Sequence, residues 1–117
     1  MRIAAGDAET VTSAWRAMTL AEEVFSQHHD EVDHLTGEAV YRRIAPLIGP
    51  LDEVGGFRTT ESVDIDYIEC AVAAHELKVI SQALEVAAEI LGEEDYEVWT
   101  GEALASARET LERLAGS

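Results

Sequence analysis

The residues best suited to chemistry form one polar cluster, His28-His29-Asp30-Glu31-Val32-Asp33-His34. Imidazole and carboxylate groups are ligands that zinc, iron and manganese take in proteins. Glu31 and His34 have the Glu-x-x-His spacing of di-iron bundles, where residues three apart share a helix face. Such a site needs a second copy of this pair, and the remaining histidine, His75, has no glutamate three residues before it. We interpret the cluster as a polar helix end, with a metal site as the alternative.

A second acidic pattern is compatible with magnesium binding. Asp30-x-x-Asp33 is followed, after 27 intervening residues, by Glu61-x-x-Asp64. This layout resembles that of the all-α nucleoside triphosphate pyrophosphohydrolases, which use two acidic pairs on two helices to hold magnesium against nucleotide phosphates. The resemblance implies a metal-dependent enzyme with its cation among these four carboxylates. The first pair departs from the family pattern, since it has aspartates where glutamates are expected.

A third pattern lies near the end of the chain, where Trp99-Thr100-Gly101 is followed by Glu102-Ala103-Leu104. It resembles the Trp-x-Gly motif of the small helical substrates of type VII secretion systems, in which the motif lies between two helices. Only 16 residues follow Gly101 and none is a tyrosine, so the Tyr-x-x-x-Asp or Glu signal of that family is missing. We interpret Trp99 as an anchor of the last helix, with Gly101 inside its first turns.

Other enzyme classes find no support in the sequence. The serines stand in no nucleophile-elbow context, and Cys70 lies in an apolar stretch that indicates packing. Gly55-Gly56 lacks the lysine and the spacing of a phosphate-binding loop. We therefore assign no catalytic residue, no metal ligand and no cofactor, and favour a protein that is not an enzyme.

The charge balance restricts the partners. Asp and Glu number 24 against 8 Lys and Arg, which gives a formal net charge of -16. Nucleic acids and anionic membranes are bound through clustered basic residues, so neither is an expected partner. No apolar run reaches the roughly 18 residues of a membrane span, and the single cysteine excludes an internal disulfide. We expect a cytoplasmic protein that binds a basic protein partner.

The elements that must position these residues are predicted to be helices. The length of 117 residues fits one domain, 1–117, with 47% apolar residues to build a core. Apolar residues recur at helical spacing over about 8–29, 37–47, 62–91 and 95–114, with Asp7 as the first N-cap. In the second helix Val40, Ile44 and Leu47 are expected to be buried, with Pro46 near its end. The prediction is an all-α, small four-helix bundle-like domain with a long central third helix.

The third helix carries two apolar seams. One seam contains Ile65, Ile68, Val72, His75, Val79, Ala83, Val86 and Ile90, and the other contains Ala73, Leu77, Ile80, Leu84, Ala87 and Leu91. On this pattern His75 is a core or subunit-interface histidine. A helix over 60–91 would be on the order of 48 Å long, too long for a compact domain of this size. Either its end packs on a second subunit, or Val63–Tyr67 is a short strand before it.

Two functions are consistent with these observations. The first is a non-enzymatic acidic helical module that binds a basic protein, as an immunity protein, antitoxin or inhibitor does, and that also forms a homodimer. The alternative is a metal-dependent all-α enzyme with carboxylates and histidines from the first and third helices converging on a cation. Convergence of residues 28–34 with residues 61–75 would favour the enzyme.

Overall fold

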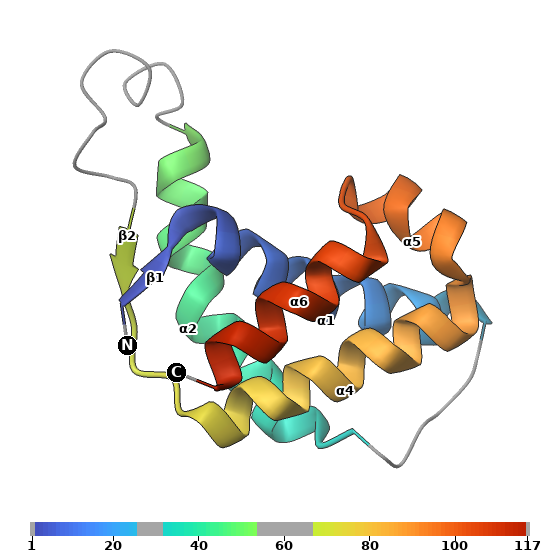
Figure 1. The fold of residues 1–117 in the computed structure, drawn as a ribbon, viewed down its shortest axis with the longest axis horizontal. Coiled ribbons are helices and arrows are strands. Elements are labelled where there is room, and N and C mark those ends of the chain that lie inside the picture. Colours follow the sequence, from blue (N-terminus) through green and yellow to red (C-terminus); the bar gives the residue numbers. More distant parts are fainter. Residues whose placement is uncertain (1, 26–31, 54–66, 117) are drawn as a thin grey trace.

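The computed structural model describes residues 2–25, 32–53 and 67–116. They form a mainly helical fold with one short two-stranded sheet, as Figure 1 shows. The predicted all-α, bundle-like class is confirmed. In chain order the elements are β1 (Arg2–Ala4), α1 (Ala5–Phe25), α2 (His34–Glu53), β2 (Tyr67–Glu69), α4 (Ala74–Leu91), α5 (Glu93–Thr100) and α6 (Leu104–Ala115).

Helix α4 is the central element. It packs most extensively on α1, and it also contacts α2, α5 and α6. Its buried side chains are Leu77, Ile80, Ala83, Leu84, Val86, Ala87 and Leu91. Most of them belong to the second predicted seam, so the sequence pattern identified the buried face of this helix correctly.

The third helix begins later than predicted, at Ala74 rather than at about 62. Glu76, in the first turn, accepts a hydrogen bond from the backbone N–H of Ala73 at 2.9 Å, which marks the helix start. The helix therefore has 18 residues, so its length gives no reason to expect a second subunit. Residues 62–66, including most of the alternative strand, lie outside the described residues.

A strand, β2, precedes this helix, and it shares Tyr67 with the alternative strand Val63–Tyr67, whose other residues lie outside the described part. Strand β2 pairs antiparallel with β1, with Ile3 opposite Ile68. Both side chains are at most 9% exposed, whereas Tyr67 and Glu69 are exposed. This alternation is the two-residue period of a strand with one buried face, and it overrides the helical prediction at Ile68. Strand β1 was not predicted, since it is only three residues long.

Helix α1 begins at Ala5, so Asp7 lies in the first turn and is not the predicted N-cap. There it accepts a hydrogen bond from Arg113 on α6 at 3.0 Å. Val11, Trp15 and Met18 are buried as predicted. Phe25 is instead 47% exposed at the end of the helix, and the remaining predicted residues, 26–29, lie outside the described part.

Helix α2 is longer than predicted in both directions, since it continues through Pro46 to Glu53. Pro46 and Pro50 both lie inside it, and a proline inside a helix costs about 3 kcal/mol. Ile44 and Ile48, on either side of Pro46, are both buried, and their burial opposes this cost. Leu47, which was expected in the core, is 38% exposed because Ile48 takes that place.

The last predicted helix is two helices, α5 and α6. Gly101 ends α5 in the left-handed conformation, with a φ of 76°, and its N–H binds the carbonyl of Glu97 at 2.8 Å. The interpretation of Gly101 as part of the first turns was therefore wrong. Tyr96 and Leu111 are buried, whereas Trp99, which was expected to anchor the last helix, lies on α5 and is 43% exposed.

None of the helices within the described ranges combines the length and the apolar character needed to cross a bilayer.

Candidate functional site

An open groove of about 640 Å³ lies between the second half of α1 and the first half of α2. This volume is within the range of roughly 300–1,000 Å³ that is usual for binding sites. On both helices the lining residues recur in steps of three and four, so one face of each helix borders the groove. The lining consists of Trp15, Arg16, Thr19, Leu20, Glu22 and Glu23 from α1, and His34, Glu38 and Tyr41 from α2.

The close approach of α1 and α2 depends on Gly37. A Cβ atom at this position would lie 2.2 Å from Cζ3 of Trp15, well inside van der Waals contact. The indole ring thus packs directly on the backbone of α2, where no side chain separates them. Trp15 is 7% exposed, and it forms the floor of the groove.

Two further contacts hold the side chains that border the groove. The ring of His34 meets that of Trp15 edge to face, with centroids 5.9 Å apart and an interplanar angle of 68°. The guanidinium of Arg16 lies 5.7 Å from the ring centroid of Tyr41, and its Nε donates a hydrogen bond to the Tyr41 hydroxyl at 3.2 Å. The groove therefore has aromatic walls whose orientation is fixed by cross-helix contacts.

Glu22 is the unusual polar group of this site. Its side chain is 12% exposed, and its Oε1 atom is buried without a hydrogen-bond partner among the described residues. The nearest basic group is Nε2 of His34, at 3.7 Å, which is beyond hydrogen-bonding distance. A buried acceptor left unsatisfied costs about 1–3 kcal/mol, and more when it is charged.

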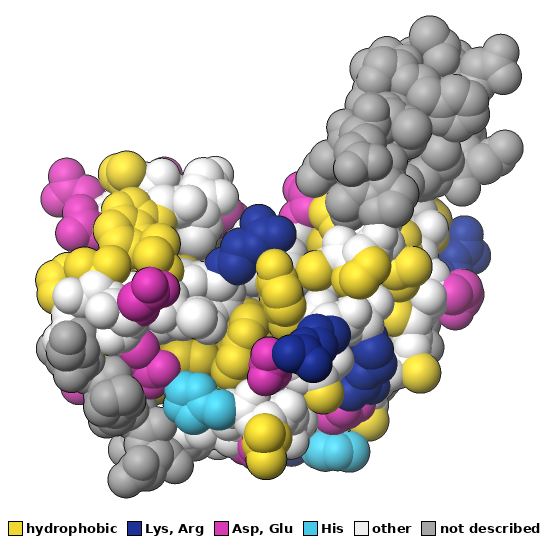
Figure 2. Space-filling view, turned by 180° about the vertical axis from the view of Figure 1, so that it is seen from behind, with side chains coloured by type: hydrophobic (Ala, Val, Ile, Leu, Met, Phe, Trp, Pro, Cys, Tyr) yellow, Lys and Arg dark blue, Asp and Glu magenta, His cyan; other side chains and the backbone are white. Residues whose placement is uncertain are grey.

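A smaller groove of about 210 Å³ adjoins the first one on the other side of α1. Ser13, Ala17, Trp99 and Thr100 line it together with Arg16 and Leu20, which border both grooves. Figure 2 shows this side of the molecule, with hydrophobic side chains gathered across it beside basic and histidine side chains. Exposed large apolar residues on α1, α2 and α5 are Leu20, Val24, Phe25, Leu35, Leu47, Val98 and Trp99.

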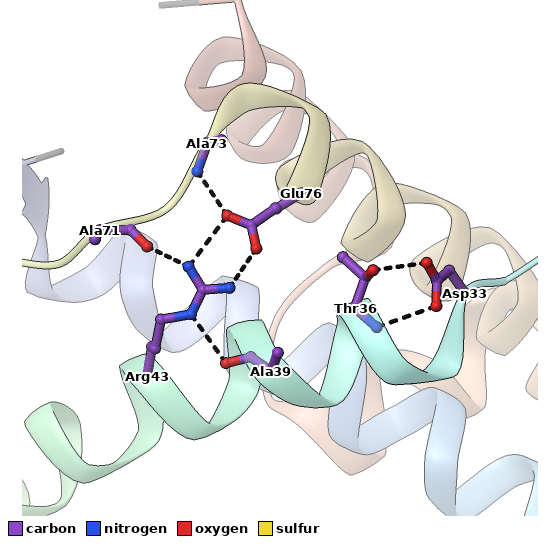
Figure 3. A network of polar contacts seen from close by, with 7 residues as sticks. All are labelled: Asp33, Thr36, Ala39, Arg43, Ala71, Ala73 and Glu76. Atoms are coloured by element: carbon purple, nitrogen blue, oxygen red, sulfur yellow. Dashed lines mark hydrogen bonds and ion pairs between the residues drawn. The ribbon is translucent and has the colours of Figure 1, made fainter.

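A satisfied polar network lies on the neighbouring part of α2, as Figure 3 shows. The guanidinium of Arg43 binds both carboxylate oxygens of Glu76 on α4 and the carbonyl of Ala71, while its Nε donates to Ala39. These bonds, first those from Arg43 and then that from the Ala73 N–H, hold the pKa of Glu76 below its ordinary value. The network joins α2 to the start of α4.

Protein-family models, curated proteins and solved structures contain no match to this chain. The function must therefore be argued from the groove and its charges.

Most of the candidate metal ligands of the alternative interpretation lie outside the described residues. These are His28, His29, Asp30, Glu31, Glu61 and Asp64. Asp33 is described, and it accepts hydrogen bonds from the hydroxyl of Thr36 at 2.6 Å and from its N–H at 3.1 Å. These bonds lower the pKa of Asp33 and make it the N-cap of α2. Its carboxylate thus has a structural role at the helix start.

The other two candidates are also accounted for by local structure. His75 is exposed in the first turn of α4, so its prediction as a core histidine was wrong. Cys70 is half-buried, and burial raises the pKa of its thiol, which opposes formation of a reactive thiolate. Among the described residues, no three His, Cys, Asp or Glu side chains lie close enough together to hold a metal ion.

The residues that do come together were present as a pattern that the sequence analysis did not use. Trp15, Thr19 and Glu22 have the same spacing as His34, Glu38 and Tyr41, namely a step of four and then a step of three along one helix face. Each set mixes aromatic and charged residues, unlike a core seam. The sequence alone does not show that the two faces meet, because that depends on how α1 crosses α2.

Proposed function

We propose that this protein is a non-enzymatic, acidic helical interaction module that binds a basic protein surface, as an immunity protein, antitoxin or inhibitor does. The observation that supports this proposal best is the groove between α1 and α2, which combines apolar and aromatic walls with a surplus of carboxylates. Three glutamates line it against one arginine. A protein partner with basic and apolar side chains would match both properties.

The exposed apolar residues around the groove support a protein partner. Leu20, Val24 and Phe25 are each more than 40% exposed on the last two turns of α1. Contiguous apolar surface of this kind is characteristic of interaction sites in soluble proteins. Trp99 on α5 extends the same surface, and tryptophan is among the residues that contribute most to binding energy.

The net charge of -16 favours basic partners over acidic ones. A large charge of one sign speeds association with a partner of the opposite sign and weakens self-association. Binding should therefore weaken as the salt concentration rises, since screening reduces this attraction. Because α4 is shorter than predicted, only the exposed apolar surface favours a homodimer. A dimer formed through this surface would place the glutamates of the two copies close together.

Affinity capture from cells of the source organism, followed by reconstitution with the purified partner, tests this function. The bait proteins are the wild type, Leu20→Asp in the groove and Ala105→Asp, which adds the same charge at an exposed position on α6. We expect a basic partner that binds the wild type and Ala105→Asp and is lost with Leu20→Asp. An acidic partner, or equal binding to all three baits, would reject the proposal.

Native mass spectrometry with and without prior chelation is the complementary measurement. It reports the number of subunits and any bound metal in a single spectrum. A metal-free species is expected. A stoichiometric metal that is lost on chelation would instead support the enzyme alternative, whose candidate ligands lie mainly in residues 26–31 and 54–66.

A further inference from the structure

The orphan carboxylate of Glu22 indicates what chemical group the groove is suited to receive. Glu22 borders the groove, and its Oε1 atom is the only buried side-chain oxygen or nitrogen of the described residues without a hydrogen-bond partner. Oε1 itself is buried, but the side chain is 12% exposed, and a ligand that brings a charged N–H group to this exposed part would neutralise the charge of the carboxylate.

The basic residue already in the groove does not fill this role. The Nε of Arg16 is bonded to Tyr41, and its guanidinium lies against the ring of that residue. His34 remains 3.7 Å from Glu22, with its ring held against Trp15. Arg16 thus does not pair with Glu22, and His34 can neutralise it only when its imidazole is protonated.

The walls of the groove fit the rest of a basic side chain. Lysine and arginine carry an apolar stem beneath their charged head, and such stems pack well on aromatic and aliphatic surface. Trp15, Leu20 and Tyr41 provide this surface on either side of Glu22. At about 640 Å³ the groove also has room for neighbouring side chains of a partner segment.

We propose that the groove between α1 and α2 binds a basic amphipathic segment of the partner protein, with Glu22 receiving the charged group of one lysine or arginine side chain. This inference rests on the proposed function, and it names the position that determines specificity. A second copy of this chain is a poor occupant, because it would bring another acidic surface to three glutamates.

The test uses a synthetic 16-residue helical peptide of leucine and lysine, labelled with fluorescein, and measures its Kd by fluorescence anisotropy. The proteins are the wild type, Glu22→Gln and Glu109→Gln, which removes the same charge at an exposed position on α6. We expect Glu22→Gln to weaken binding at least about tenfold, or about 1.4 kcal/mol. Glu109→Gln should change Kd less than about twofold. Circular dichroism and thermal unfolding confirm that both variants are folded.

The outcomes separate this inference from the proposed function. Equal weakening by both substitutions would show attraction to the overall charge, and it would reject the groove as the docking site while leaving an acidic interaction module in place. No binding of the peptide to the wild type would also reject the inference. A dimer of the protein alone that dissociates on Glu22→Gln would assign the groove to a second copy. Failure of the proposed function is seen separately, as an acidic captured partner.

Discussion

Helix α2 packs on a glutamate of α4 and on a glutamate of α1 that are buried to nearly the same degree, but the hydrogen bonding of the two carboxylates differs. At the junction with α4, Glu76 is 15% exposed and is bound by Arg43 and the Ala73 N–H. In the groove with α1, Glu22 is 12% exposed and has one oxygen without a hydrogen-bond partner among the described residues. The junction is therefore complete within the chain, whereas the groove keeps a buried carboxylate oxygen that no described residue binds.

This difference distinguishes polar groups that stabilise the fold from polar groups that are candidates for a role in binding. A buried carboxylate with its hydrogen bonds made contributes to folding, whereas an unsatisfied one lowers stability and is retained where it serves another purpose. A third glutamate supports the distinction, since Glu102 accepts hydrogen bonds from the buried hydroxyl of Thr10 at 2.6 and 3.0 Å. Substitutions at each of these places should then have different consequences for stability.

The largest effect is expected from Gly37→Ala, which removes the close contact that forms the groove. The new Cβ would lie 2.2 Å from the indole of Trp15, so α1 and α2 must move apart. We expect a loss of about 1–3 kcal/mol in the free energy of unfolding, measured by urea denaturation. Gly6→Ala is the control, because nothing lies within 4 Å of its Cβ. Equal stability of the two variants would show that Gly37 does not set the helix spacing.

Arg43→Ala tests the junction, and we expect a loss of about 1–2 kcal/mol at neutral pH, limited because its side chain is 36% exposed. The pKa of Glu76 is lowered in the folded protein, so its contribution is complete above the ordinary glutamate pKa of about 4.3 and is lost as the pH falls through the lower, folded value. Removing Arg43 should flatten the loss of stability below about pH 4.3. An unchanged pH profile would contradict this assignment.

Thr10→Val tests the third glutamate and should cost about 1 kcal/mol. Thr10 is 4% exposed, so valine keeps the packing and removes the hydrogen bonds to Glu102 together with the longer one to the Gly6 carbonyl at 3.3 Å. The measurement is the shift in thermal unfolding, with Thr19→Val on the exposed face of α1 as the control. Identical shifts for the two variants would mean that the Glu102 bonds contribute nothing.

The smallest effect on stability is expected from Glu22→Gln, at the site where the charge is unsatisfied. Replacing the carboxylate by a neutral amide removes a buried charge, so the free energy of unfolding should stay unchanged or rise by up to about 1 kcal/mol. Glu76→Gln is the matched comparison and should lower it. A loss above about 1 kcal/mol for Glu22→Gln in urea denaturation would place Glu22 among the structural glutamates.

The fold could be predicted from the sequence where one periodic pattern dominates. Leu77, Ile80 and Leu84 lie on the buried face of α4, because apolar residues that recur at helical spacing share one face and are buried together. The ends of elements were less predictable. The start of α4 depends on the contact of Glu76 with Ala73, and the break at Gly101 depends on a single left-handed residue.

The candidate site was harder to predict, because it is formed by a crossing of two helices. In the sequence, Glu22 does not differ from a solvent-exposed glutamate, and its burial depends on the packing of α2 on α1. Gly37 is unfavourable for a helix on its own, and its role depends on the packing of Trp15 against it. The histidine-rich cluster has the residue types of a metal site, but its member Asp33 caps the start of α2. Composition indicates which groups are present, whereas burial decides which of them are left unsatisfied.

The pairing of β1 with β2 limits how early in synthesis the N-terminal strand can fold. Ile3 and Ile68 are about 65 positions apart in the chain, whereas α4, α5 and α6 follow one another directly. Contacts between distant residues form slowly, because a long loop must close first. On the ribosome, the first strand emerges well before its partner is synthesised. Ile3, which is fully buried in the finished protein, therefore stays exposed to chaperones and aggregation until more than half of the chain has been made.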